Sequence, residues 1–144
     1  MDDRITEHLK RLNKYYLHLS NARKLEKEIF IKEDLYQASS ERYLQMAIES
    51  CLNIGNRLIS LYQFKNPVDT PETYADIFIG IKRIGVVDDL FCRRLVKMAK
   101  FRNRLVHLYW ELDKETLYGF IQNDLDDFKL FEQKVVEYLN KNPL

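Results

Sequence analysis

Three side chains with complementary chemistry lie close together between residues 102 and 109. Arg102, His107 and Tyr109 follow the spacing R-x4-H-x-Y, within a run that is otherwise basic and apolar. A guanidinium binds a phosphate through two parallel hydrogen bonds without titrating, an imidazole gives or takes a proton near pH 7, and a phenol can carry a modification. These residue types could cut a phosphodiester without a metal ion, so this segment is the candidate site of chemistry.

The motif and a second segment together resemble a known family, the HEPN domains. Asn103 supplies a polar residue directly after Arg102, and residues 41–56 resemble the second helix of the small bacterial HepT-like toxins, which are encoded beside a minimal nucleotidyltransferase antitoxin. The similarity in length and helical pattern extends over residues 1–144 as a single domain. One departure is Asn53, where that group often has an acidic residue, and Glu49 is the nearest carboxylate that could replace it.

The resemblance implies a metal-independent endoribonuclease that needs no cofactor and acts as a toxin on RNA. In the implied mechanism the ribose 2′-hydroxyl attacks the adjacent phosphate, His107 moves the proton, Arg102 stabilises the growing negative charge and Asn103 positions the reacting groups. Tyr109 would receive adenylate from the nucleotidyltransferase antitoxin, which would block the substrate. HEPN toxins are known as dimers whose two motifs line a shared cleft, so the resemblance also implies a homodimer.

The geometry of an ideal helix raises a question about this motif. At about 100° per residue, Arg102 lies in the middle of an apolar seam formed by Phe91, Leu95, Met98, Leu105 and Tyr109. A structural alternative is a snorkelling arginine, or a buried ion pair with a carboxylate such as Glu49. His107 lies about 140° from Arg102, with Asn103 one turn beneath it. Either the last turn unwinds, or the site is completed across a dimer whose fourth helices meet.

Two other interpretations remain open at this stage. The chain could be a non-catalytic helical module that binds a nucleotide or a nucleotidyltransferase, although the complete R-x4-H-x-Y spacing favours an enzyme. It could also be a plain helical scaffold, which requires Arg102 to be ion-paired and His107 to be fully solvated.

Positive charge is concentrated around the motif, although the net charge of the chain is only +1. Residues 90–110 contain six Lys and Arg side chains and no acid. Lys97, Lys100 and Arg104 are therefore the candidates for binding an RNA backbone. The alternative is a solvated face that is neutralised by the acidic segment 111–137.

Composition favours one cytoplasmic domain. A chain of 144 residues can bury roughly two-thirds of its unfolded surface. Cys51 and Cys92 have no pairing pattern, which predicts reduced thiols in a core. His8 and His18 lack the spacing of metal ligands, so no metal site is expected and both are interpreted as helix-surface residues. The first residues have no leader pattern and no apolar run reaches membrane length, so no membrane association is expected.

Five helices are predicted from apolar periodicity and from the few Gly and Pro residues. They cover about 2–29, 34–66, 70–85, 88–109 and 113–140. Asp34 with Gln37 predicts a capping box, Thr70-Pro71 a helix start and Gly85 a helix end. Asp88 or Asp89 and Asp113 are the expected N-caps of the last two. The expected fold is all-α, an antiparallel up-and-down bundle of four long helices with one short extra helix.

Overall fold

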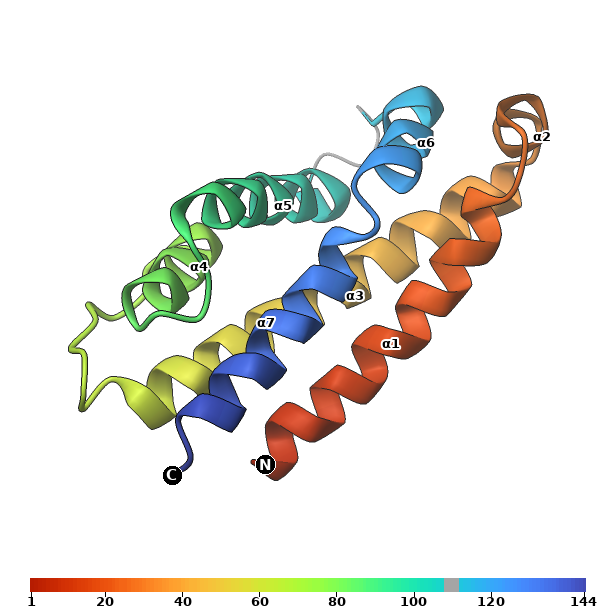
Figure 1. Cartoon of the computed structure of the whole chain (residues 1–144). Helices are drawn as coiled ribbons and strands as arrows, with labels where there is room; N and C mark the ends of the chain where they lie inside the picture. Colours follow the sequence, from red (N-terminus) through yellow and green to blue (C-terminus); the bar gives the residue numbers. More distant parts are fainter. Residues whose placement is uncertain (108–111) are drawn as a thin grey trace.

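The chain forms a bundle of antiparallel helices, seen in a computed structural model that describes residues 1–107 and 112–144 (Figure 1). Seven helices lie within these ranges: α1 (Asp3–Arg23), α2 (Lys27–Lys32), α3 (Asp34–Tyr62), α4 (Tyr74–Arg83), α5 (Asp89–His107), α6 (Lys114–Asn123) and α7 (Asp127–Lys141). Helices α1, α3 and α7 lie side by side, and α4 pairs with α5 on the other side of α3. The predicted all-α bundle of four long helices is confirmed, but three short helices accompany it instead of one.

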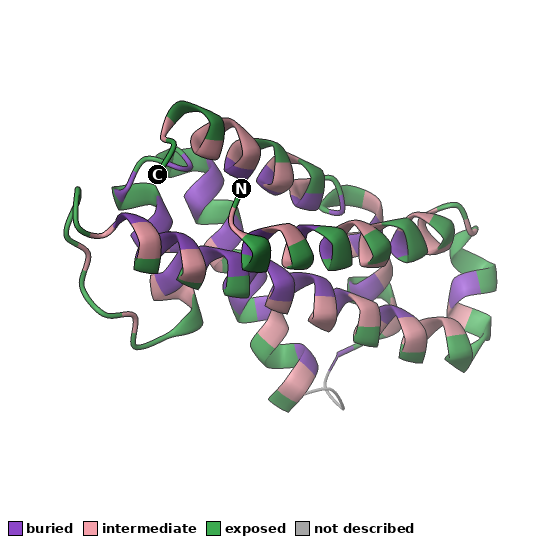
Figure 2. Ribbon diagram, turned by 90° about the horizontal axis from the view of Figure 1, so that it is seen from below, coloured by how far each residue is buried: buried purple, intermediate pink, exposed green. Residues whose placement is uncertain are grey.

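The apolar stripes read from the sequence form the core of this bundle. Along α3, seven apolar residues of one stripe are buried: Leu44, Ala47, Ile48, Cys51, Leu52, Leu58 and Ile59. In Figure 2 the buried residues lie on the helix faces that are turned toward one another. Cys51 and Cys92 are buried and free, and burial raises the pKa of both thiols. No helix in the described ranges has the length and apolarity needed to cross a membrane.

Two predicted helices are each split in two, which corrects the expected boundaries. The first helix ends at Arg23 and the last is interrupted after Asn123, although neither place has a Gly or Pro. Side chains of α6 satisfy the carbonyl groups freed at the first break: Gln122 donates to the carbonyl of Arg23 at 2.8 Å, and Tyr118 donates to that of Leu25 at 2.8 Å. These partners are distant in sequence, so local punctuation did not reveal the break.

The expected starts of two helices were also wrong in detail. Helix α3 begins at Asp34, but Glu33 is its N-cap without a side-chain bond, and the Gln37 amide donates to Glu41. Helix α3 then ends at Tyr62, before the predicted stop at Asn66-Pro67. Thr70-Pro71 precedes α4 instead of opening it. A capping box between Thr73 and Asp76 starts that helix, because hydroxyl and carboxylate together satisfy two amides at the helix start.

Other predicted boundaries are confirmed. Gly85 ends α4 in the left-handed region at φ +96°, which a residue without Cβ adopts readily. Asp88 accepts from the amide of Phe91 at 2.8 Å, and Asp113 accepts from that of Thr116 at 2.6 Å. Helix α5 therefore starts at the expected place and carries the motif along its length.

Helix α4 lies very close to α3. A Cβ added at Gly55 would come within 2.6 Å of Ile77, and one added at Gly80 within 2.6 Å of Ile59. Helix backbones approach this closely only where no side chain separates them. This contact fixes the first turn of α4, with Tyr74, beside the motif helix α5.

Candidate functional site

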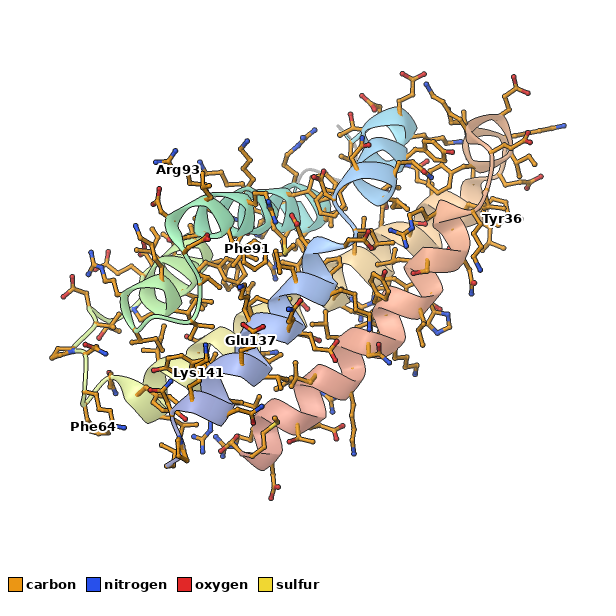
Figure 3. The ribbon with its side chains drawn as sticks, viewed as in Figure 1. Tyr36, Phe64, Phe91, Arg93, Glu137 and Lys141 are labelled. Carbon is orange, nitrogen blue, oxygen red and sulfur yellow. The ribbon has the colours of Figure 1, made fainter. Side chains whose placement is uncertain are left out.

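The apolar seam of α5 faces the core of its own chain. Phe91, Leu95, Met98 and Leu105 are buried, and the Arg102 side chain among them is only 11% exposed. Figure 3 shows Phe91 on the side of α5 toward α7 and Arg93 on the outer side. Within the described residues the bundle itself covers this seam, so the seam gives no argument for a dimer.

The Arg102 guanidinium is held from three sides. Its Nε and Nη2 donate to the same carboxylate oxygen, Oε1 of Glu49 on α3, at 3.2 and 2.8 Å. Its Nη1 donates to Oδ1 of Asn103 at 3.4 Å, and its centre lies 4.5 Å from the ring centroid of Tyr74 on α4. The amide of Gln45 donates to the same Glu49 oxygen at 3.2 Å. The ion pair with Glu49, which was one alternative for this arginine, is therefore present.

An open hollow lies between α3, α4 and α5 beside this arginine. It has a volume of about 580 Å³, and its lining includes Tyr74, Asn56, Asn103 and His107. Ligand pockets of folded proteins commonly have volumes of roughly 300–1,000 Å³. Asn103 and His107 line the hollow directly, whereas Arg102 lies behind its wall, where it contacts Tyr74 and Asn103.

This arrangement answers the geometrical question raised by the sequence. Helix α5 remains α-helical through His107, so no unwinding up to that residue brings the motif together. Instead, the guanidinium extends to Tyr74 and Asn103, while His107 and Asn103 line the hollow from one face of α5. His107 is exposed, but it is a wall of a hollow and not an isolated surface residue. The plain-scaffold interpretation required an ion-paired Arg102 and a fully solvated His107. Only the first of these two conditions is met.

The bonding of Arg102 determines which part of it could meet an anion. Nε and Nη2 are directed at Glu49, whereas Nη1 has, among the described residues, only the long contact to Asn103. Charge-assisted hydrogen bonds are commonly about 2.7–2.9 Å long. Nη1 is therefore the guanidinium nitrogen that a phosphate in the hollow could engage without displacing Glu49.

Tyr74 and Asn56 belong to this site, but reasoning from sequence alone did not select them. The Thr73–Asp76 capping pattern could have placed Tyr74 in a first helical turn. Nothing local, however, connects Tyr74 to an arginine 28 positions later. Tyr109 falls outside the described residues.

The candidate RNA-binding residues of α5 lie on one face of the helix, because they are three and four positions apart. Lys97, Lys100 and Arg104 are exposed. Lys97 borders a separate hollow near Asp124 and Asp127, away from His107. Arg94 pairs with Asp127 at 3.0 Å, so the acidic segment neutralises part of the strip, as the alternative interpretation expected.

Of the other two histidines, His18 is a helix-surface residue as expected, whereas His8 is not. His18 is exposed and stacks on Tyr43 with ring centroids 4.5 Å apart. His8 is half-buried, and its Nδ1 is enclosed without a hydrogen-bond partner among the described residues. Within residues 1–107 and 112–144, no group of three or more His, Cys, Asp or Glu side chains is placed to hold a metal ion.

Comparison with known proteins points to one family. The family model described as Ribonuclease HepT-like matches residues 5–135. A protein of Aphanizomenon flos-aquae (strain 2012/KM1/D3), named tRNA nuclease HepT, is 22% identical over 135 residues, which cover 94% of this chain and 89% of that protein. A Shewanella oneidensis protein named mRNA nuclease HepT is 28% identical over 88 residues, covering 61% of this chain and 63% of that protein.

Solved structures share the fold. A tri-AMPylated Shewanella oneidensis HEPN toxin, determined in complex with MNT antitoxin, has a TM-score of 0.84 and 23% identity, with 96% of this chain and 99% of that chain covered. The cytosolic protein YutE from Bacillus subtilis, whose function is described as unknown, has a TM-score of 0.74 and 20% identity. The match covers 94% of this chain and 91% of that chain.

Proposed function

We propose, from the premise that this chain belongs to the HepT-like ribonuclease family, that it is a metal-independent endoribonuclease that cuts RNA by attack of a ribose 2′-hydroxyl. The family predicted from the R-x4-H-x-Y spacing is confirmed by the match over residues 5–135. The metal independence, the RNA substrate and the roles of individual residues are the content of the proposal.

In the proposed reaction, the 2′-oxygen forms a bond to the adjacent phosphorus while the bond from phosphorus to the 5′-oxygen breaks. His107 takes the proton from the 2′-hydroxyl and returns it to the departing 5′-oxygen. Arg102 offers Nη1 to the phosphate oxygens, on which negative charge grows, and Asn103 orients the phosphate. The products are a 2′,3′-cyclic phosphate and a 5′-hydroxyl. An acid–base group of this kind contributes about 10²- to 10⁴-fold in rate.

The observation that carries this proposal is the meeting of the motif at one hollow. Asn103 and His107 line it, and Tyr74 connects its wall to the Arg102 guanidinium. A titratable group for the proton thus lines a space large enough for a nucleotide, and a cation for the phosphate lies directly behind its wall. We propose that Lys100 and Arg104, which are exposed on the same helix, attract the RNA backbone. Lys97, also exposed, would contact the RNA farther from the hollow.

The residue assignments are tested by alanine variants with matched controls. Arg102→Ala and His107→Ala should each lower the cleavage rate of a single-stranded RNA by at least about 10²-fold, without loss of the folded state in circular dichroism. Arg83→Ala and His18→Ala remove the same side-chain types from exposed positions outside the hollow and should cut at the normal rate. Normal cleavage by His107→Ala would show that His107 does not transfer the proton.

The partner proposed for this chain is a minimal nucleotidyltransferase that acts as its antitoxin. The similar Shewanella toxin is tri-AMPylated and bound to MNT antitoxin, by its description. In this chain Tyr109 is the proposed acceptor of adenylate, seven residues after Arg102, which is about 10 Å along a helix. An adenylate phosphate there would compete with RNA for Arg102. We also propose a cytoplasmic location and a single domain over residues 1–144.

A second candidate function is binding without cleavage. The observation that favours it is the engagement of Arg102 by Glu49, which leaves the guanidinium partly compensated. A module of this kind would hold a nucleotide or a nucleotidyltransferase in the hollow. RNA binding by wild type, with no cut product after prolonged incubation, would support this function over the nuclease.

A further inference from the structure

A second hollow adjoins the candidate site on the surface of α1 and α3. Its lining consists of Arg4, His8, Asn53, Asn56, Arg57 and Ser60. Asn56 also lines the hollow that contains Asn103 and His107. The two hollows therefore share a wall, and a ligand that extends beyond the first would pass over Asn56 into the second.

The lining has the chemistry of a site for a sugar–phosphate chain. It contains two arginines, one imidazole, two amides and one hydroxyl, and it has neither an acid nor an apolar side chain. Backbone contacts to nucleic acids come from residues of these types. A protein partner would be expected to meet aromatic or aliphatic anchors at the centre of its interface, and this hollow offers none.

The two arginines differ in how far they are already engaged. Arg57 donates from Nε and Nη2 to Oδ2 of Asp2 at 3.1 and 2.8 Å, so the carboxylate compensates much of its charge. The Arg4 side chain is exposed and makes no ion pair with the described residues. Arg4 is therefore the cation with which an incoming phosphate could pair.

His8 lines this hollow and is half-buried. Its Nδ1 is enclosed and has no hydrogen-bond partner in the described part of the protein, so Nε2 is the ring nitrogen left to meet a ligand in the hollow. Burial, followed by the nearby charge of Arg11, lowers the pKa of His8. A neutral imidazole can donate to a phosphate oxygen or accept from a ribose hydroxyl.

We propose that this hollow over α1 and α3 is a second subsite of the nuclease, which binds the phosphate and ribose of an RNA nucleotide next to the cut bond through Arg4, His8 and Asn53. The inference rests on the proposed function for its ligand. Because Asn53 carries no charge, the subsite accepts a phosphate where a carboxylate would repel it.

Two variants and one control test the subsite in the full-length protein. Arg4→Ala removes the unpaired cation, and Asn53→Asp places a negative charge against the phosphate. Arg83→Ala is the matched control, since Arg83 is exposed, lies outside the hollow and is paired with Asp69. The binding probe is a 12-nucleotide single-stranded RNA with 2′-O-methyl riboses, which cannot be cut by the proposed chemistry. Fluorescence anisotropy gives its Kd at several salt concentrations.

Both variants should raise the Kd of this probe about 5- to 10-fold over the control. Arg4→Ala should also reduce the slope of log Kd against log salt concentration by about one. With cleavable RNA of the same sequence, the KM should rise while the kcat is retained. Equal Kd values for Arg4→Ala, Asn53→Asp and Arg83→Ala would overturn the subsite. A change in the sedimenting mass of both variants, with unchanged Kd, would also overturn it and assign the hollow to a contact between copies.

The two proposals fail in different ways. If the wild type cuts RNA but the variants bind the probe normally, the subsite proposal is refuted and the nuclease proposal stands. If the wild type never cuts RNA but the variants bind the probe more weakly, the nuclease proposal is refuted and the subsite proposal stands. The binding readout does not depend on turnover, so each result is decisive for its own proposal.

Discussion

Arg102 is held by Glu49 at the point where the proposed chemistry needs a phosphate ligand. The Arg102 side chain is 11% exposed and that of Glu49 is 34% exposed, so the pair is partly shielded from water. Both short bonds end on one carboxylate oxygen, which fixes the guanidinium and leaves Nη1 directed at Asn103. We interpret Glu49 as a positioning residue that orients Arg102 for the phosphate and does not itself contact it.

Replacing Glu49 by glutamine tests this role. Glu49→Gln keeps the side-chain shape and one acceptor but removes the charge, so Arg102 should be held less firmly. We expect the free energy of unfolding to fall by about 1 kcal/mol and kcat to fall about tenfold, with a smaller change in KM. Urea denaturation and cleavage kinetics measure the two effects. Faster cleavage by this variant would show that Glu49 competes with the substrate for Arg102.

Tyr109 is the residue at which the proposed antitoxin should act. Coexpression with a minimal nucleotidyltransferase should add adenylate units to the wild-type chain and none at position 109 of Tyr109→Phe, as read from intact and peptide masses. The variant alone should still cut RNA, because the phenol is assigned to modification and not to catalysis. Loss of cleavage by unmodified Tyr109→Phe would place the phenol in the reaction or in folding, and the switch elsewhere.

The sequence predicted the positions of the motif residues better than their surroundings. Residue type and spacing selected Asn103 and His107, which line the hollow, and helix geometry predicted that Arg102 lies on a buried seam. Tyr74 and Asn56 were not selected, because their part in the site depends on the packing of α4 and α3 against α5. His8 was taken as a surface residue, since the enclosure of its Nδ1 arises from tertiary packing.

Helix ends could be predicted from the sequence where the residues that start or end the helix are close to it in the sequence. Gly85, Asp88 and Asp113 act through their own backbone conformation or through amides two to three residues away. The break after Arg23 depends on Gln122 and Tyr118, roughly a hundred positions later in the chain. No periodicity within the first 30 residues carries that information.

Two glycine substitutions separate backbone strain from helix propensity. Gly85 has φ +96° and open space at its Cβ position, so Gly85→Ala should lower the free energy of unfolding by about 1 kcal/mol through backbone strain alone. Gly119 lies inside α6, also with open space. Gly119→Ala should therefore raise that free energy by roughly 0.5–1 kcal/mol. Urea denaturation measures both, and equal shifts of the same sign would contradict this account.

At the scale of the whole molecule, the proposed active unit is a homodimer. The apolar seam of α5 does not argue for it, since the bundle covers the described residues of this seam. The support that remains is the position of His107 and Asn103 on an open surface hollow, where the hollows of two copies can face each other. Sedimentation equilibrium at micromolar concentration should give twice the chain mass, and a clean monomer that still cuts RNA would show that one chain is sufficient.

The most direct test of the central claim is the chemistry of the cut ends. Wild-type protein should cut a single-stranded RNA in excess EDTA, and mass spectrometry should find 2′,3′-cyclic phosphate, or its hydrolysis product, on one fragment and a 5′-hydroxyl on the other. An RNA with 2′-deoxyribose at the cut position should remain intact. Cleavage that stops in EDTA, or fragments that carry 5′-phosphate and 3′-hydroxyl ends, would contradict attack by the 2′-hydroxyl assisted by Arg102 and His107.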